Sequence, residues 1–334
     1  MNSGSKGEGM PRPTSPSWQS VLERSIQLPG ERQRLVTALG INPMTLNRWV
    51  KAETQPNRNH LIDLLRYVQP QYRQELRDAM RESYPDIDSW VVDEAPEHIS
   101  AEFYTQILND RATLIEATRN REILDKILKQ ALIQLDPHQL GMAITLVQCM
   151  PPGKDGKIHS LRERMGRGTP PWIADLENLS IFLAMESLAG FVVQYQRPAS
   201  IEDISKETLL PAYQTDYEIS AAAAPIMLDG NIAGCLLASS TEVDHFTQQR
   251  LTLLAAFSDL TSLALESKEY YPPRIIQLGI LLHRDAEEQR KILRSFRSRV
   301  QTKLIEGYQH QTPLTYAQAE ECVWSELEEL VLLG

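Results

Sequence analysis

The chain has 334 residues, of which 42% are hydrophobic and 23% charged. This length predicts two or three domains, because single hydrophobic cores rarely extend beyond about 250 residues. No stretch approaches the roughly 20 apolar residues that span a bilayer, so we expect no membrane partner. Residues 1–17 are rich in Ser, Gly and Pro without the apolar core of a secretory signal, and we interpret them as a disordered leader.

Three cysteines, Cys149, Cys235 and Cys322, are too few and too scattered for a disulfide framework. The sequence has no Cys-x-x-Cys and no His-x-x-x-His, so we expect no metal site. Reduced thiols are typical of the cytoplasm, which is the location we predict.

The net charge of −10 is distributed unevenly along the chain. Residues 1–80 contain 11 Lys and Arg against 7 Asp and Glu, which leaves 23 against 37 for the remainder. A basic amino-terminal region joined to an acidic body is typical of a DNA-binding module fused to a domain that does not bind DNA.

The expected fold is a multidomain chain of α and α+β classes. Short helices separated by Gly and Pro predict a helical domain over residues 18–84, and two prolines mark an irregular acidic linker over 85–99. A leading helix capped by Ser100 and a region of strands predict an α+β domain over 100–267. Residues 268–334 are expected to form a carboxy-terminal helical region.

Residues 31–59 carry the most specific local pattern. Residues 31–39 predict a short helix with Leu35, Ala38 and Leu39 facing inward, and Gly40 suits a tight turn that needs positive φ. Asn42 is the predicted cap of a second helix, followed by Pro43 at its first position. That helix places Leu46 and Trp49 on its inner side, and residues 57–68 predict a further amphipathic helix.

The run of residues 35–49 resembles the Cro/repressor-type (XRE) helix-turn-helix, with Val36 where that family usually has a small Ala. The resemblance covers residues 18–68 and implies that residues 43–50 form a recognition helix in the major groove of double-stranded DNA, in a homodimer. The predicted DNA-binding residues are Gln33, Asn42, Met44, Thr45, Asn47, Arg48, Lys51 and Arg58. The alternative is a small helical bundle with solvated charges.

The central region contains a strong hairpin signal. Residues 220–227 and 232–239 are apolar runs on either side of Asp229-Gly230, and Thr247 caps a following helix. Residues 141–150 and 157–164 predict an earlier pair of strands.

The runs 224–226, 229–230, 232–236 and 246–247, with the closing helix to residue 265, resemble a GAF domain, and the resemblance extends over residues 122–266. It implies an antiparallel sheet with helices on one face and a ligand pocket on the other. It also implies dimerisation through terminal helices, which suits the apolar stripe between Leu124 and Leu135.

A small-molecule ligand is expected, although the sequence identifies neither the ligand nor a cofactor. Residues 159–172 concentrate three arginines and a tryptophan, which suit an anionic or aromatic ligand. The alternative is a loop held by pairing of Glu163 and packing of Trp172. Cys149 and Cys235 lie in predicted strands and suggest either a redox role or simple core packing. The candidate ligand-binding residues are Arg162, Arg164, Arg167, Trp172 and Cys235.

The carboxy-terminal region predicts two helices. Residues 284–303 contain seven basic and three acidic residues beside an apolar stripe, which suits a packing or dimer helix with a solvated basic face, or additional DNA contacts. Residues 315–332 are expected to turn Ala319, Cys322, Val323, Leu327 and Leu330 to one side, and their acidic cluster at 326–329 is expected to pair with the basic helix.

Together these patterns predict a dimeric, sequence-specific transcriptional regulator whose GAF-like domain senses a small ligand or redox signal. The alternative is a protein-interaction adaptor that does not bind DNA. The sequence contains no nucleophile elbow, P-loop or His-Glu-x-x-His, so we expect no catalytic residues and no enzyme.

Overall fold

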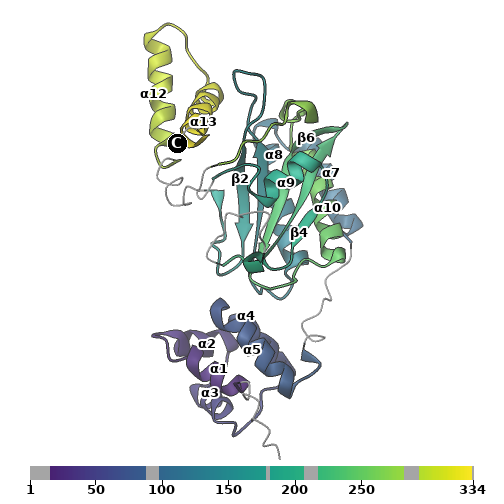
Figure 1. The fold of residues 1–334 in the computed structure, drawn as a ribbon, viewed down its shortest axis with the longest axis vertical. Helices are drawn as coiled ribbons and strands as arrows, with labels where there is room; N and C mark the ends of the chain where they lie inside the picture. The colour runs from purple at the N-terminus through teal and green to yellow at the C-terminus, as the bar shows by residue number, and fades with distance from the viewer. Residues whose placement is uncertain (1–15, 88–97, 178–180, 207–216, 282–292, 333–334) are drawn as a thin grey trace, which may run out of the picture. The chain divides into compact units, whose positions relative to one another are not determined.

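A computed structural model describes residues 16–87, 98–177, 181–206, 217–281 and 293–332 (Figure 1). The chain divides into two compact units, residues 1–92 and 93–334. The expected leader falls, up to residue 15, outside the described residues, as does most of the expected linker, residues 88–97. None of the described helices is long and apolar enough to cross a membrane.

The first unit is entirely helical within its described part. Its helices are α1 (Trp18–Ser25), α2 (Glu31–Leu39), α3 (Pro43–Val50), α4 (Arg58–Tyr67) and α5 (Pro70–Ser83). The side chains that fill its core come from all five helices, and the largest of those that are fully buried are Trp18, Leu22, Leu35, Leu46, Leu61, Leu64, Leu65, Leu76 and Met80.

Helices α2 and α3 have the bounds predicted from their caps. Gly40 ends α2 with φ of 62°, and the Asn42 side chain accepts a hydrogen bond of 2.9 Å from the Met44 amide at the start of α3. One prediction is wrong: Ala38 is exposed and Val36 is buried. The inward face of α2 is set by Leu35 and Leu39, four residues apart; Val36 and Ala38 flank this stripe on opposite sides, and the fold covers only the Val36 side.

The second unit contains one antiparallel sheet of six strands in the order β3-β2-β1-β6-β5-β4. The strands are β1 (Met142–Cys149), β2 (Leu161–Gly168), β3 (Phe182–Leu183), β4 (Ala199–Ile201), β5 (Ser220–Leu228) and β6 (Asn231–Ser240). The predicted hairpin is present, and Asp229 and Gly230 form its turn with φ of 49° and 73°. Two positive φ values at the centre of a two-residue loop match the twist of paired strands.

The predicted strand over 157–164 is displaced. β2 begins only at Leu161, because the residues before it pair with a later segment of the chain. The Ile158 amide donates to the Ile275 carbonyl at 2.9 Å, and the Gln277 amide donates to the Ile158 carbonyl at 2.9 Å. This partner lies more than a hundred residues away, so the local pattern could not reveal it.

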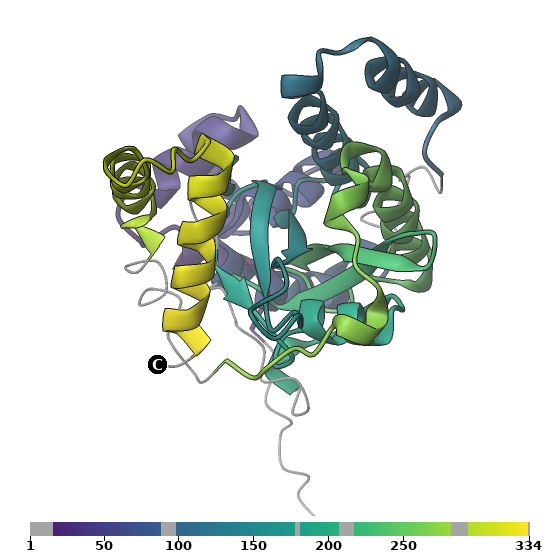
Figure 2. The same cartoon turned by 90° about the horizontal axis from the view of Figure 1, so that it is seen from above.

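Helices cover both faces of the sheet (Figure 2). α7 (Ala101–Thr113), α8 (Glu116–Leu135) and α10 (Gln248–Thr261) share an apolar core with one face, and α9 (Leu188–Tyr195) shares a second core with the other. The α8 stripe from Leu124 to Leu135 is buried in the first of these cores. The expectation that this stripe pairs two copies is therefore wrong, since its apolar side chains already pack within one chain.

Two further helices, α12 (Phe296–Gln309) and α13 (Tyr316–Leu332), pack beside the β2–β3 edge (Figures 1 and 2). Their shared core includes Val300, Ala319, Val323 and Leu327 together with Phe182 of β3. Residues 284–292 of the predicted basic helix lie outside the described residues.

The predicted inner face of α13 is partly wrong. Cys322 is exposed and so is Leu330, whereas Trp324 is half-buried and Glu328 is buried. The side of α13 that faces the sheet is thus wider and more polar than its aliphatic stripe. The predicted pairing of the acidic cluster is confirmed at Glu326, which lies 2.6 Å from Lys303 of α12.

Candidate functional site

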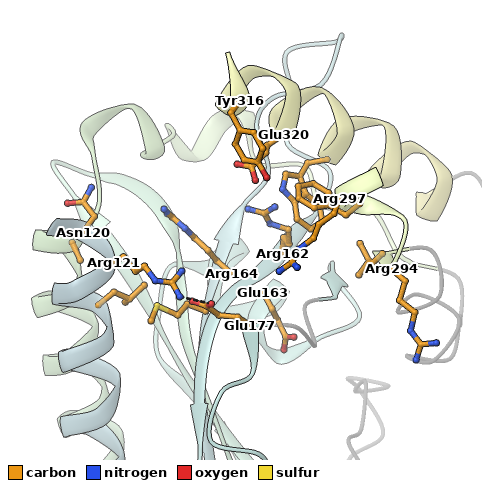
Figure 3. A pocket seen from close by; sticks show the side chains of 16 residues that line it. Asn120, Arg121, Arg162, Glu163, Arg164, Glu177, Arg294, Arg297, Tyr316 and Glu320 are labelled. Carbon is orange, nitrogen blue, oxygen red and sulfur yellow. Dashed lines mark hydrogen bonds and ion pairs between the residues drawn. The ribbon is translucent and has the colours of Figure 1, made fainter. Parts of the chain in front are cut away.

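A cavity of about 760 Å³ lies where the second unit's sheet meets its carboxy-terminal helices (Figure 3). Its walls come from β2, from the first turns of α8, and from α12 and α13 with the residues just before α12. Five arginines and three glutamates contribute to its lining: Arg121, Arg162, Arg164, Arg294, Arg297, Glu163, Glu177 and Glu320. The rest of the lining consists of Asn120, Tyr316 and apolar side chains, among them Leu124 and Met165.

Arg162 is the most constrained of these arginines. Its guanidinium carbon lies 3.8 Å from the centroid of the Trp324 ring, a cation–π contact between β2 and α13. Its Nε atom is buried and has no hydrogen-bond partner among the described residues. Burial, reinforced by the positive charge of Arg164, lowers the pKa of Arg162 to about 10.

Arg164 follows Arg162 by two residues, so the two side chains lie on the same face of β2. The pairing of β1 with β2 passes from Leu146–Met165 to Val147–Glu163, which makes Arg164 the extra residue of a bulge. The Nη1 atom of Arg164 donates to Gln148 Oε1 at 2.8 Å and to Glu269 Oε1 at 2.7 Å, which fixes its position at the cavity wall.

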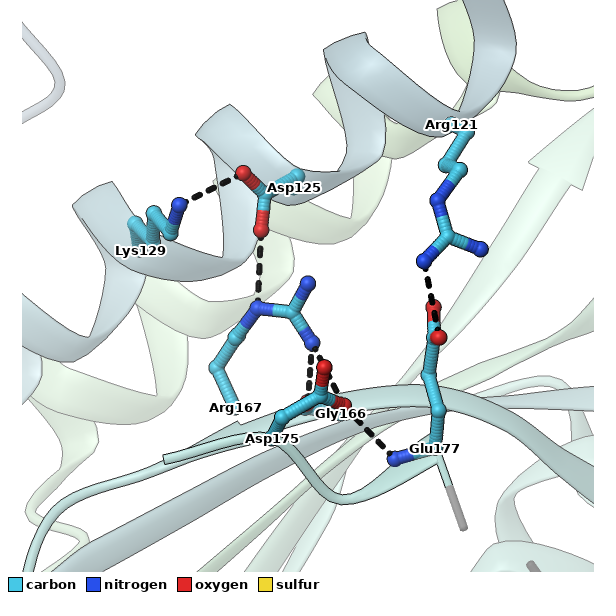
Figure 4. A network of polar contacts seen from close by, with 7 residues as sticks. All are labelled: Arg121, Asp125, Lys129, Gly166, Arg167, Asp175 and Glu177. Carbon is cyan, nitrogen blue, oxygen red and sulfur yellow. Dashed lines mark hydrogen bonds and ion pairs between the residues drawn. The ribbon is translucent and has the colours of Figure 1, made fainter. Parts of the chain in front are cut away.

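Arg121 and Arg167 take part in contacts between α8 and the sheet (Figure 4). Arg121 forms an ion pair of 2.8 Å with Glu177. Arg167 lies 2.7 Å from Asp125 and 3.2 Å from Asp175, outside the cavity lining. Burial raises the pKa of Asp125, but hydrogen bonds from Lys129 and Arg167 outweigh it, so the pKa is lowered overall.

Of the five candidate ligand-binding residues, the fold brings Arg162 and Arg164 together and separates the other three from the cavity. Arg167 is held by its two aspartates. Trp172 is buried in the loop after β2, with its ring centroid 6.1 Å from that of Tyr217. Cys235 is fully buried in the core beneath α9.

The two strand cysteines lie on neighbouring strands, since β1 pairs with β6. Burial raises the pKa of Cys149 to about 12 and also raises the pKa of Cys235. Thiols in such surroundings are poor nucleophiles, because the reactive form is the thiolate. Among the residues that the structure describes, no group of three or more His, Cys, Asp or Glu could hold a metal ion.

The candidate DNA-binding residues lie on or beside α2 and α3. Met44 is 62% exposed, and Gln33, Arg48, Lys51 and Arg58 are exposed as well. Thr45 and Asn47 are half-buried; the Asn47 side chain accepts a hydrogen bond from Arg32 of α2. Asn42 is occupied as the cap of α3.

α12 and α13 bring residues to the cavity that the sequence did not indicate as ligand-binding, among them Arg297, Glu320 and Trp324. The only local signal was the position of Trp324 in an amphipathic helix between the acidic pairs Glu320-Glu321 and Glu328-Glu329. Nothing local indicated that this helix packs beside β2.

Comparison with known proteins gives one family match: the GAF domain matches residues 120–265. No curated protein matches the chain. Among solved structures, the GAF domain of a phosphoenolpyruvate-protein phosphotransferase from Acinetobacter is 16% identical and covers 50% of this chain and 93% of its own, with a TM-score of 0.35. A free methionine-R-sulfoxide reductase from Neisseria meningitidis, in complex with its substrate, is 12% identical and covers 50% and 91%, with a TM-score of 0.33.

The expectation that the chain is not an enzyme requires correction. Similar structures include free methionine-R-sulfoxide reductases, also from Staphylococcus aureus at 18% identity, 49% and 95% coverage and a TM-score of 0.31. Structural similarity at 12–18% identity assigns no activity to this chain. The absence of the catalytic motifs considered in the sequence, however, does not exclude catalysis. The central part of the chain, residues 120–265, is a GAF domain, a ligand-sensing fold.

Proposed function

We propose that the chain is a DNA-binding transcriptional regulator that acts as a homodimer, with the GAF domain as its sensor. The observation that carries the proposal is the surface of α3. Leu46 and Trp49 are buried beneath this helix, while Met44 and Arg48 are exposed on its outer side. A short helix that is anchored by two apolar residues and presents a cation outward suits the major groove.

Local geometry supports the same assignment. The Asn42 cap and Pro43 fix the start of α3. A hydrogen bond from Arg32 of α2 to the Asn47 side chain fixes the orientation of α3 relative to the preceding helix, and with it the direction in which the exposed face of α3 points. A rigid face reads a sequence with less loss of side-chain entropy than a mobile one. Lys51 and Arg58 follow at exposed positions that suit phosphate contacts.

The first test is retention of genomic DNA fragments from the source organism by the full chain at two salt concentrations, followed by sequencing. A regulator retains fragments that share a site, preferably palindromic because a symmetric dimer reads two half-sites. Retention must weaken as salt rises, since phosphate contacts release counterions. A chain that retains no fragments above background, with or without candidate ligands, would instead support the adaptor function.

The second test changes one side chain. Arg48→Ala is expected to weaken binding to the recovered site by about 5- to 150-fold, the equivalent of ~1–3 kcal/mol, without loss of helix content. The matched control is Arg81→Ala, which removes one positive charge from α5, outside the predicted contact surface. Equal affinities of the Arg48→Ala variant and the unsubstituted chain at matched salt would remove α3 from the recognition role.

A further inference from the structure

We propose that the cavity between β2 and the helices α12 and α13 is the sensor's ligand site, and that its ligand is a small organic anion bearing a carboxylate or phosphate. This inference deepens the sensing part of the proposed function and rests on it, but it does not depend on DNA binding.

The charge of the cavity favours an anion. Five arginines face three glutamates in the lining. Arg121 is neutralised by Glu177 and Arg164 by Glu269. Arg162 and Arg297 form no ion pair with any residue in the described ranges, and Arg297 points toward the same space as Arg162 (Figure 3). Glu163 and Glu320 also line the cavity, and the charge of Glu320 acts on Arg162. Five arginines against the three lining glutamates and Glu269 therefore leave an excess of one positive charge that an anion would compensate.

Arg162 supplies a donor suited to such a ligand. Stacking on Trp324 occupies the face of its guanidinium, whereas the N–H groups point outward in the plane of the group. The buried Nε atom has no partner among the described residues, and a buried donor without an acceptor is costly. Carboxylate and phosphate match the guanidinium fork with two parallel hydrogen bonds.

The walls explain why binding would have a structural consequence. Arg162 and Arg164 belong to the GAF domain, but Arg297 and Trp324 belong to helices outside residues 120–265. A ligand bonded to both sets would hold α12 and α13 against β2. The volume of about 760 Å³ suits a metabolite-sized molecule, and Leu124 and Met165 offer apolar contact for its carbon skeleton.

The test is isothermal titration of the full chain with two probes, sodium phosphate and sodium benzoate, against sodium chloride at equal ionic strength. We expect saturable binding of at least one probe and none of chloride. Saturation by phosphate alone assigns a phosphorylated ligand, and saturation by benzoate alone assigns a carboxylate. Saturation by neither probe would overturn the proposal.

Three variants locate the binding. Arg162→Lys keeps the charge but removes the planar fork, and Arg297→Gln removes a charge from α12; each is expected to raise the dissociation constant about tenfold. Arg274→Gln makes the same change at an exposed position outside the cavity and should leave the dissociation constant unchanged. Wild-type affinity in both cavity variants, with circular dichroism unchanged, would place the anion elsewhere.

The outcomes separate the two proposals. A chain that retains specific DNA but binds neither probe keeps the regulator and loses the anion site. A chain that binds a probe through Arg162 and Arg297 but retains no DNA keeps the anion site and loses the DNA-binding function.

Discussion

Two glycines of the β5–β6 hairpin illustrate how strongly a single position is constrained by what lies beside it. Gly230, in the turn, has φ of +73° and open space around the position of a Cβ atom. Gly234, inside β6, has φ of +150°, and a Cβ atom there would lie 2.0 Å from the Val147 carbonyl oxygen. Both are simple glycines in the sequence, but only one permits the close approach of a neighbouring strand.

Substitution by alanine distinguishes the two glycines. Gly230→Ala is expected to cost about 1–2 kcal/mol, the conformational penalty of a left-handed residue. Gly234→Ala adds a clash with the β1 backbone and is expected to cost at least about 3 kcal/mol. Urea unfolding followed by circular dichroism measures both values, and equal losses would contradict the close approach of β1 and β6.

The three arginines of β2 also differ in what surrounds each of them. Composition marked Arg162, Arg164 and Arg167 equally, as a cluster suited to an anion. Arg162 and Arg164 share one face of β2, where Arg162 stacks on Trp324 and Arg164 pairs with Glu269, whereas two aspartates hold Arg167 outside the cavity. The residue types could be predicted, but their separate surroundings depend on strand register and on remote helices.

At the scale of elements, α13 attaches to the sheet through an unusual buried group. Glu328 is buried and its Oε1 atom accepts a hydrogen bond of 2.6 Å from the Ser160 hydroxyl. Burial raises the pKa of Glu328, as does neighbouring Glu329, while the Ser160 hydrogen bond and His159 act in the opposite direction and do not cancel it. The folded state therefore stabilises the protonated carboxyl relative to the unfolded chain.

The sign of the resulting pH dependence follows from this raised pKa. Below the ordinary value of 4.5 the carboxyl is protonated in both folded and unfolded chains and carries no penalty. As the pH rises through the raised pKa, the folded chain must ionise a buried group. Its free energy of unfolding is then lower than it is at low pH.

Glu328→Gln removes this loss, because the amide is neutral and its oxygen still accepts from Ser160. The melting temperature of the variant should exceed that of the unsubstituted chain by a margin that grows as the pH rises above about 4.5 and levels off once Glu328 is ionised in the folded chain. Glu321→Gln, at an exposed position of the same helix that does not contribute to the pKa shift of Glu328, is the control and should show no such trend. A constant margin for Glu328→Gln would show that ionisation of Glu328 is not the cause.

At the scale of the whole molecule, the two proposals make one joint prediction. If the anion changes the affinity for DNA by some factor, the DNA must change the affinity for the anion by the same factor. Typical couplings correspond to about 5- to 150-fold. Titrating the better probe into the full chain with and without its DNA site measures one factor, and DNA binding with and without the probe measures the other.

We expect the two fold-changes in affinity to be equal to each other and clearly different from one, and we expect Arg297→Gln to abolish both. If both fold-changes equal one, the anion and the DNA bind independently, and the cavity does not regulate DNA binding. Tight binding of the anion would not change that conclusion, since only a difference in affinity between two states shifts their populations.

The sequence by itself determined the features that depend on neighbours within a few residues. The bounds of α2 and α3 follow from Gly40, Asn42 and Pro43, and the β5–β6 hairpin follows from Asp229-Gly230, because caps and turns are formed by short-range hydrogen bonds and backbone angles. The pattern from 224 to 265 was also sufficient to indicate the GAF domain.

Only the tertiary structure decided which surfaces are free and which are shared. It buried the α8 stripe within one chain, started β2 at Leu161 by pairing the preceding residues with a segment more than a hundred residues later, and placed Trp324 over Arg162. These contacts join positions far apart in the sequence, and their choice depends on which surfaces bury the most apolar area together. A cavity assembled from such contacts has no signature within any single segment.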